Sequence, residues 1–88
     1  MFEFDDEKSA ANLAKHGIDF ETAQALWRDE NCIEFDMYSD IEPRSAVTGH
    51  IGDRQWTAII TMRGNATRII SVRRAWEKEI RAYGTQKD

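Results

Sequence analysis

After one short alternating segment, the first thirty residues show the apolar spacing of two helices. Residues 2–4 alternate as Phe-Glu-Phe, which predicts an edge strand. A helix is expected over residues 7–16, because Asp5 or Asp6 can cap its start and Gly17 can end it in a left-handed conformation.

The second predicted helix begins after Asp19, which can cap it, and ends near Arg28. Its buried stripe consists of Phe20, Ala23 and Trp27. We assign all three tryptophans of the chain to packing rather than to binding of nucleobases: Trp27, Trp56 and Trp76.

The apolar pattern then changes to alternation, and strands are expected over residues 32–38, 45–51, 55–63 and 63–73. Two-residue turns at Gly52-Asp53 and Gly64-Asn65 join the last three strands. Residues 76–83 close the domain as a helix. These elements predict an α+β fold with two N-terminal helices, a mostly antiparallel sheet of about four strands, and a C-terminal helix.

If both turns have two residues, strand alternation fixes which side chains share a face of the sheet. One face is an apolar core made of Val47, Gly49, Ile51, Trp56, Ala58, Ile60, Met62 and Ile69. The opposite face is polar and basic, with Thr48, His50, Gln55, Thr57, Thr61, Arg63 and Arg68, interrupted by Ile59, Ile70 and Val72. A shift of one residue in the pairing would reverse this assignment.

Two adjacent arginines, Arg73 and Arg74, stand where the last strand passes into the closing helix. The strand would hold both guanidinium groups at the edge of the sheet, where their planar donors can form paired hydrogen bonds to a phosphate. The alternative is an ion pair with Glu77, with Glu79 or with the acidic N-terminal half, and it remains open for either arginine.

The length of 88 residues suffices for a single domain over residues 1–88 with a modest core. A composition of 41% hydrophobic and 32% charged residues is typical of globular proteins and not of disordered chains. No apolar run approaches the roughly 20 residues of a membrane helix, and the acidic start lacks the order of a signal peptide. We therefore expect a cytoplasmic protein without a membrane partner.

Cys32 is the single cysteine, which excludes an internal disulfide and a thiolate zinc cluster.

The net charge of -4 at pH 7 conceals an uneven distribution along the chain. Residues 1–42 carry 12 acidic and 3 basic side chains, whereas residues 43–88 carry 4 acidic and 9 basic ones. A basic face could therefore meet phosphates while salt screens the acidic part beyond about 10 Å. Two solvated surfaces without a partner would give the same numbers.

Several short motifs occur in a characteristic order: Phe-Glu-Phe-Asp-Asp-Glu-Lys at 2–8, Asn-Leu-Ala-Lys-His-Gly at 12–17, Ile-Asp-Phe-Glu-Thr-Ala at 18–23, Gly-His-Ile-Gly at 49–52, Arg-Ile-Ile-Ser-Val-Arg-Arg-Ala at 68–75 and Glu-Lys-Glu-Ile-Arg-Ala-Tyr at 77–83. In this order and at this length, nearly the whole chain resembles the BrnT toxins of bacterial type II toxin-antitoxin modules. Lys-His-Gly followed later by Ile-Ser-Val-Arg-Arg-Ala is the most specific part of the resemblance.

The resemblance implies a compact fold similar to RelE and a ribonuclease activity that blocks translation. It also implies neutralisation by a BrnA-type antitoxin, whose DNA-binding ribbon-helix-helix portion would let the pair repress its own operon. The chain departs from the family in being more acidic, with a pI near 5.1.

RNA can be cleaved when its own 2′-hydroxyl attacks the adjacent phosphate, which requires a base, an acid and cations around the phosphate. No His-x-x-x-His motif, cysteine pair or carboxylate cluster has the spacing of metal ligands. We therefore expect metal-independent chemistry without a cofactor.

His16 is the first candidate for the acid or base, because histidine titrates near neutral pH and this one lies in the Lys-His-Gly motif. The alternative is that His16 only complements the end of a helix. The predicted catalytic residues are His16, Arg63, Arg73 and Arg74, and the predicted RNA-binding residues are Lys15, His50, Arg68 and Tyr83. His50 is the second candidate for proton transfer, since the sheet pattern places it on the polar face, and its alternative is an exposed strand residue.

Three functions remain in competition at this point. The leading hypothesis is a ribonuclease toxin held inactive by a partner protein. A non-catalytic module that binds nucleic acid or an antitoxin would bind RNA in a salt-dependent way without cleaving it. A purely structural interaction domain would show neither property.

Overall fold

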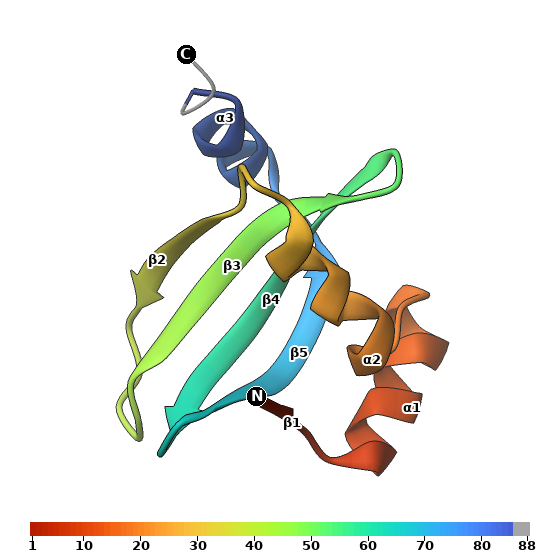
Figure 1. Ribbon diagram of the computed structural model, residues 1–88, viewed down its shortest axis with the longest axis vertical. Coiled ribbons are helices and arrows are strands. Elements are labelled where there is room, and N and C mark those ends of the chain that lie inside the picture. Colours follow the sequence, from red (N-terminus) through yellow and green to blue (C-terminus); the bar gives the residue numbers. More distant parts are fainter. Residues whose placement is uncertain (86–88) are drawn as a thin grey trace.

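The computed structural model describes residues 1–85 and confirms the predicted α+β class (Figure 1). Its helices are α1 (Asp6–His16), α2 (Phe20–Ala23), the 3-10 helix η1 (Gln24–Arg28) and α3 (Glu77–Thr85). Its strands are β1 (Phe2–Glu3), β2 (Ile33–Met37), β3 (Arg44–Ile51), β4 (Arg54–Arg63) and β5 (Ala66–Arg74). The second predicted helix is therefore present as two consecutive pieces, α2 and η1.

The five strands form one sheet in the order β1-β5-β4-β3-β2. β1 runs parallel to β5, and the other three pairs are antiparallel. Both predicted two-residue turns are present, with Gly52 at φ 64° and Gly64 at φ 58°. Since no residue other than glycine has a positive φ in residues 1–85, the turns have glycine at their first central position, as type II′ hairpins require.

A bulge interrupts the ladder between β4 and β5 at Ile59 and Ile60, where Ile70 has no opposite residue. The extra residue shifts the later part of β5 by one position relative to β4. The prediction that Val72 lies on the polar face is wrong, because this shift places it opposite Ala58 in the core. The prediction had assumed an uninterrupted ladder.

Two side chains that were expected to be buried are exposed. Met62 is 59% exposed, because it lies next to the turn that joins β4 and β5. Trp76 is 53% exposed at the start of α3, where the guanidinium of Arg73 covers one ring face. Trp56 is buried and Trp27 is half-buried, as predicted.

Helices α1, α2 and η1 cover one face of the sheet (Figure 1). The hydrophobic core lies between them and the strands, and it consists of Ile18, Phe20, Ala23, Leu26, Val47, Trp56, Ala58, Ile60, Ile69 and Val72. Asp5 caps α1 through hydrogen bonds to the amides of Glu7 and Lys8, and Gly17 ends the helix at φ 85°.

The side chain of Asn12 attaches α1 to the edge of the sheet. Its amide donates to the carbonyl oxygens of Ile18 (2.8 Å) and Val72 (2.9 Å), and its oxygen accepts from the amide of Val72 (3.2 Å). β1 pairs with β5 at Thr67 and Arg68, so Asn12 satisfies the backbone further along the same strand.

Helix α3 lies on the opposite face of the sheet, where a buried ion pair holds it. The carboxylate of Glu79, which is 2% exposed, accepts two hydrogen bonds from Arg73 at 2.8 and 2.9 Å. Glu79 also accepts from the Trp76 amide (2.7 Å) and from the hydroxyl of Thr57 on β4 (2.9 Å). Burial raises the pKa of Glu79, but these hydrogen bonds outweigh it and hold the pKa below its usual 4.5.

The stability of the fold should therefore depend on the ionisation of Glu79. Because the pKa is lower in the folded state, the carboxylate stabilises the protein fully above pH 4.5, and this contribution is lost as pH falls through the folded pKa. We expect Glu79→Gln to lower the free energy of unfolding by about 3 kcal/mol at pH 7. The difference from the unsubstituted protein should shrink below pH 4.5, as measured by urea unfolding over a pH series.

Glu77→Gln is the matched control, because Glu77 forms an exposed pair with Arg81 on the same helix. We expect this control to change the free energy of unfolding by less than about 1 kcal/mol. A loss in Glu79→Gln that stays constant at every pH would contradict the role of the ionised carboxylate.

Candidate active site

Arg73 and Arg74 differ in whether a carboxylate pairs with them. Arg73 is 18% exposed and bound to Glu79, so the ion pair that was left open for one of the two arginines occurs at Arg73. Arg74 is exposed, and no carboxylate pairs with it within residues 1–85. Its guanidinium lies 5.5 Å from the ring centroid of Trp56, a contact that orients the cation without neutralising it. Arg74 is thus the arginine of this pair that is open to a phosphate.

The other two predicted arginines lie near the opposite end of the sheet. Arg63 pairs with Ala66 beside the turn, whereas Arg74 pairs with Trp56, and the intervening strand spans about 23 Å at 3.3 Å per residue. Arg68 is engaged with Glu3, at 3.0 Å between Nη1 and Oε2. The structure therefore does not bring Arg63 and Arg74 into one site.

His16 and Lys15 occupy the last turn of α1, as expected for cations near a helix C-terminus. They line a hollow of about 230 Å³ between α1 and β5, together with Lys8 and Ser71. No acidic side chain lines this hollow, so it is a small basic site. His16 has neither a hydrogen bond nor an ion pair with another side chain in the described part of the chain.

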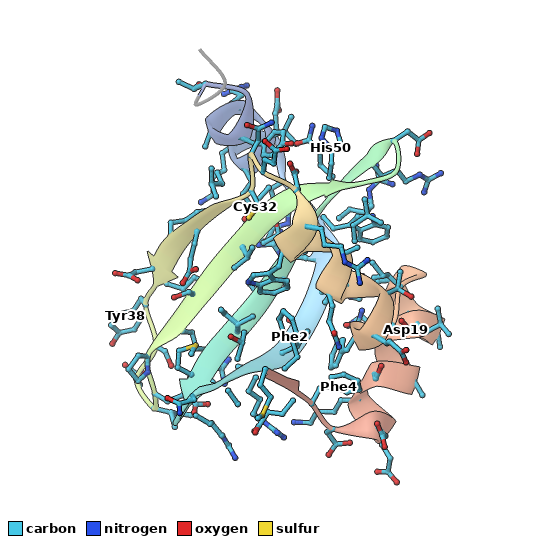
Figure 2. All side chains as sticks on the ribbon, viewed as in Figure 1. Phe2, Phe4, Asp19, Cys32, Tyr38 and His50 are labelled. Carbon is cyan, nitrogen blue, oxygen red and sulfur yellow. The ribbon has the colours of Figure 1, made fainter. Side chains whose placement is uncertain are left out.

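His50 lies near the end of β3, close to α3 and to the hairpin that joins β3 and β4 (Figure 2). Its Nδ1 is 3.0 Å from the hydroxyl oxygen of Tyr83, a buried residue of α3. The same hydroxyl lies 2.6 Å from Oδ2 of Asp29, at the end of η1. Three segments far apart in the sequence thus form a continuous hydrogen-bonded chain, Asp29–Tyr83–His50.

The chemistry of the three groups fixes the direction of these hydrogen bonds. Burial raises the pKa of Asp29, but hydrogen bonds from Tyr83 and from the backbone amides of His50 and Asn31 outweigh it, so the net shift is downward. Asp29 is therefore ionised near neutral pH and can only accept. Burial and the neighbouring Asp29 raise the pKa of Tyr83 to about 12, so its hydroxyl keeps its proton and donates it to Asp29.

It follows that Nδ1 of His50 must carry the hydrogen of its bond to Tyr83. In the neutral ring the free nitrogen is then Nε2, which has a lone pair and can accept a proton. This arrangement resembles in principle the orientation of a catalytic histidine by a carboxylate, with a tyrosine hydroxyl placed between the two groups.

Asp29 is held in place from several sides. Its Oδ2 accepts from the His50 amide at 2.8 Å, and its Oδ1 accepts from the Asn31 amide at 2.9 Å. Gly49 leaves the necessary space, because a Cβ there would lie 3.2 Å from Oδ2 of Asp29 and 3.1 Å from Cβ of Cys32. The side chain of Asn31 partly offsets the rise in the pKa of the Tyr83 hydroxyl.

Sequence reasoning had missed Asp29 and Gly49 as parts of this cluster. The local signal for Asp29 is the Asp-x-Asn spacing, which is typical of a turn in which the carboxylate accepts an amide two residues later. That signal predicts the turn and says nothing of His50, which lies 21 positions further along the chain.

Cys32 is also close to this cluster but does not contribute a reactive thiolate. Burial, together with Asp29 and Glu34, raises the pKa of its thiol. No group of three or more His, Cys, Asp or Glu side chains in the described residues could hold a metal ion. No helix among them is long and apolar enough to cross a membrane.

Comparison with known proteins gives one family. The family model described as "Ribonuclease toxin, BrnT, of type II toxin-antitoxin system" matches residues 4–79. No curated protein matches the chain. Since residues 4–79 are most of the 88 residues and include α1 and the strands β2 to β5, the chain belongs to the BrnT family of ribonuclease toxins of type II toxin-antitoxin systems.

Proposed function

We propose that this chain is a metal-independent endoribonuclease that inhibits translation in the cytoplasm and is neutralised by a BrnA-type antitoxin. Membership of the BrnT family supports a ribonuclease toxin that has an antitoxin as its partner. The observation that carries the catalytic part of the proposal is the hydrogen-bonded chain Asp29–Tyr83–His50, which leaves Nε2 of a histidine free to transfer a proton.

In this proposal, Nε2 of His50 takes the proton of the RNA 2′-hydroxyl as that oxygen bonds to the adjacent phosphorus. The bond from phosphorus to the 5′ oxygen breaks, the 5′ oxygen leaves with a proton from water, and the other product is a 2′,3′-cyclic phosphate. Tyr83 and Asp29 are positioning residues, because they act through His50. They hold the ring with Nδ1 protonated and stabilise the positive charge that develops on it.

Arg74 is proposed to bind the phosphate on which negative charge accumulates. Gly49, Trp56 and Arg74 are consecutive neighbours across β3, β4 and β5, so their backbones span about 10 Å at 4.8 Å per strand. Arg74 thus belongs to the same end of the sheet as His50, which directly follows Gly49. Strand alternation places the Arg74 side chain on the face of Trp56 and the His50 side chain on the opposite face, toward α3. In this proposal the RNA strand therefore passes over the end of the sheet to contact both side chains.

The remaining predicted residues receive supporting roles. Arg73 stays in the proposal as the residue that anchors α3, and thereby Tyr83, through Glu79. Lys15 and His16 form the small basic hollow beside β5, where they would bind RNA away from the cleaved bond. Arg63 would do the same at the β4–β5 turn, and Arg68 contributes less because Glu3 pairs with it.

The two histidines can be separated by substitution. We expect His50→Gln to slow cleavage of RNA by at least about 100-fold, because it removes the group that transfers the proton. His16→Gln should change the rate by less than about threefold, since His16 binds RNA away from the cleaved bond in this proposal. Gel analysis of a defined RNA, cleaved in the presence of EDTA by purified protein, measures both rates. Full activity of His50→Gln would exclude His50 as the base. Loss of all activity of the unsubstituted protein in EDTA would contradict metal independence.

The role of Tyr83 predicts a change in the tautomer of His50. Tyr83→Phe keeps the buried ring but removes the hydroxyl that accepts from Nδ1. We expect cleavage to slow by about tenfold or more, and the Nδ1-protonated form of His50 to lose its preference in ¹⁵N NMR spectra of the neutral ring. Tyr38→Phe is the control, because Tyr38 is 89% exposed and lies outside this cluster. An unchanged tautomer in Tyr83→Phe would show that the hydroxyl does not orient His50.

The two adjacent arginines should give opposite results. Arg74→Ala should abolish growth arrest and RNA cleavage while leaving the free energy of unfolding within about 0.5 kcal/mol, because its side chain is exposed. Arg73→Ala should lower that free energy by about 3 kcal/mol, because it leaves the buried Glu79 carboxylate without its cation. Urea unfolding and expression in the absence of antitoxin measure the two effects. Retained toxicity of a stable Arg74→Ala variant would remove Arg74 from the mechanism.

A further inference from the structure

β2 is an outer strand of the sheet, opposite the edge that β1 forms. One side of β2 pairs with β3 over five residues, from Ile33↔Thr48 to Met37↔Arg44. No described strand pairs with its other side, so a row of backbone donors and acceptors is available there.

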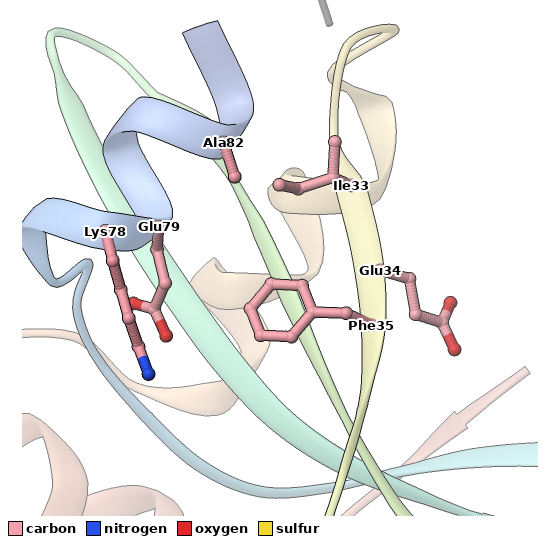
Figure 3. Close-up of a pocket in the computed structure, with 6 residues that line it drawn as sticks. All are labelled: Ile33, Glu34, Phe35, Lys78, Glu79 and Ala82. Carbon is pink, nitrogen blue, oxygen red and sulfur yellow. The ribbon is translucent and has the colours of Figure 1, made fainter. Parts of the chain in front are cut away.

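An apolar groove runs alongside this free strand. Ile33 and Phe35 point from β2 toward α3, and Ala82 points from α3 toward them (Figure 3). They line a hollow of about 470 Å³ together with Lys78 and Glu79.

The groove continues past Phe35 into a second hollow of about 360 Å³, which Met37, Tyr38 and Trp76 line. Tyr38 and Trp76 are largely exposed. The two hollows share Phe35, and apolar side chains make up much of their lining. An exposed groove of this kind, on a chain of 88 residues, is typical of a binding site for another protein.

The charges around the groove indicate the kind of partner. Glu34 points away from the groove (Figure 3), and both Glu34 and Asp36 are exposed without a cationic partner in the described residues. Asp40 follows shortly after β2. The cations that line the groove are Lys78 and Arg73, and the charge of Arg73 is paired with Glu79. An acidic strand disfavours RNA and favours a segment rich in lysine or arginine.

The same charges disfavour a second copy of this chain. If two β2 strands paired antiparallel about Phe35, Glu34 of each copy would lie opposite Asp36 of the other. Like charges directly opposite each other destabilise a pair of strands. The free edge of β2 therefore favours a basic partner over the β2 strand of a second copy.

We propose that an extended segment of the antitoxin adds to the free edge of β2 as a sixth strand. Apolar side chains at alternate positions would enter the groove between β2 and α3, and the intervening lysines or arginines would face Glu34 and Asp36. This inference rests on the proposed function for the existence of the antitoxin, and it adds the surface, the conformation and the residue pattern of the bound segment.

The test uses the full chain and the purified antitoxin encoded by the neighbouring gene. Ala82→Arg places a bulky cation in the groove at an exposed helical position, and we expect it to weaken binding in calorimetry by at least about tenfold. Ala10→Arg makes the same change at an exposed position of α1 and should leave the affinity unchanged. Equal affinity of Ala82→Arg and the unsubstituted chain would overturn the proposal.

The charge pattern has its own test. Glu34→Lys combined with Asp36→Lys should weaken binding about tenfold or more, whereas Glu21→Lys on α2 should not. Binding that is unaffected by the double reversal would overturn the basic pattern assigned to the segment.

Amide hydrogen exchange distinguishes the possible occupants. Added protection of residues 33–37 in the complex supports a sixth strand, and protection confined to α3 would overturn it in favour of a helix in the groove. The sixth strand would also be overturned if the free chain dimerises in sedimentation and the dimer protects residues 33–37 from exchange. Protection of these residues by RNA would overturn it as well.

RNA cleavage measured on the same variants separates this inference from the proposed function. Ala82→Arg that still cleaves RNA but escapes inhibition by the antitoxin supports both. If Ala82→Arg cleaves RNA and the antitoxin still inhibits it, the groove is overturned as the binding site and the ribonuclease function is not. If the unsubstituted chain does not cleave RNA but Ala82→Arg weakens antitoxin binding, the ribonuclease function is overturned and the groove is not.

Discussion

The ion pair between Arg73 and the buried carboxylate of Glu79 determines where α3 lies, and the candidate active site and the groove both depend on α3. Removing two charges from water is costly, so the net gain in stability from such a pair is small, whereas removing one partner leaves a buried charge without compensation. Here its partners come from the end of β5, the first turns of α3 and Thr57 on β4, which together leave the helix one orientation. Tyr83 then lies against His50, and Ala82 lies opposite β2.

The uneven distribution of charge along the sequence corresponds to different parts of the fold. β2 and the segment that follows it carry exposed carboxylates, whereas Arg74 and the Lys15–His16 hollow are basic. An overall net charge of -4 therefore does not describe the surface that RNA would meet. The acidic excess is consistent with a protein partner bound to β2, away from Arg74.

Features that depend on neighbouring residues could be predicted from the sequence. The caps at Asp5 and Gly17 and the turns at Gly52 and Gly64 are local, because a side chain or a positive φ within a few residues determines them. Alternation likewise predicted which strand residues share a face, up to the bulge at Ile70. Beyond the bulge the prediction failed, because nothing in the local pattern shows that a ladder skips one residue.

The candidate site could be predicted only as a set of residue types. Arginines near the end of β5 and two histidines were found, but their partners were not, because Glu79 and Asp29 reach Arg73 and Tyr83 through the packing of distant segments. Which arginine is free, and which histidine has an oriented ring, is a property of tertiary structure.

The side chain of Asn12 has a consequence for the composition of any complex. With β1 at its start and the amide of Asn12 further along, β5 has no continuous row of free backbone groups to offer. In the described part of the chain, strand addition can therefore happen at one side of the sheet, and once per molecule. A complex built in that way has a fixed one-to-one stoichiometry and stops growing, where a sheet open on both sides could extend into a filament.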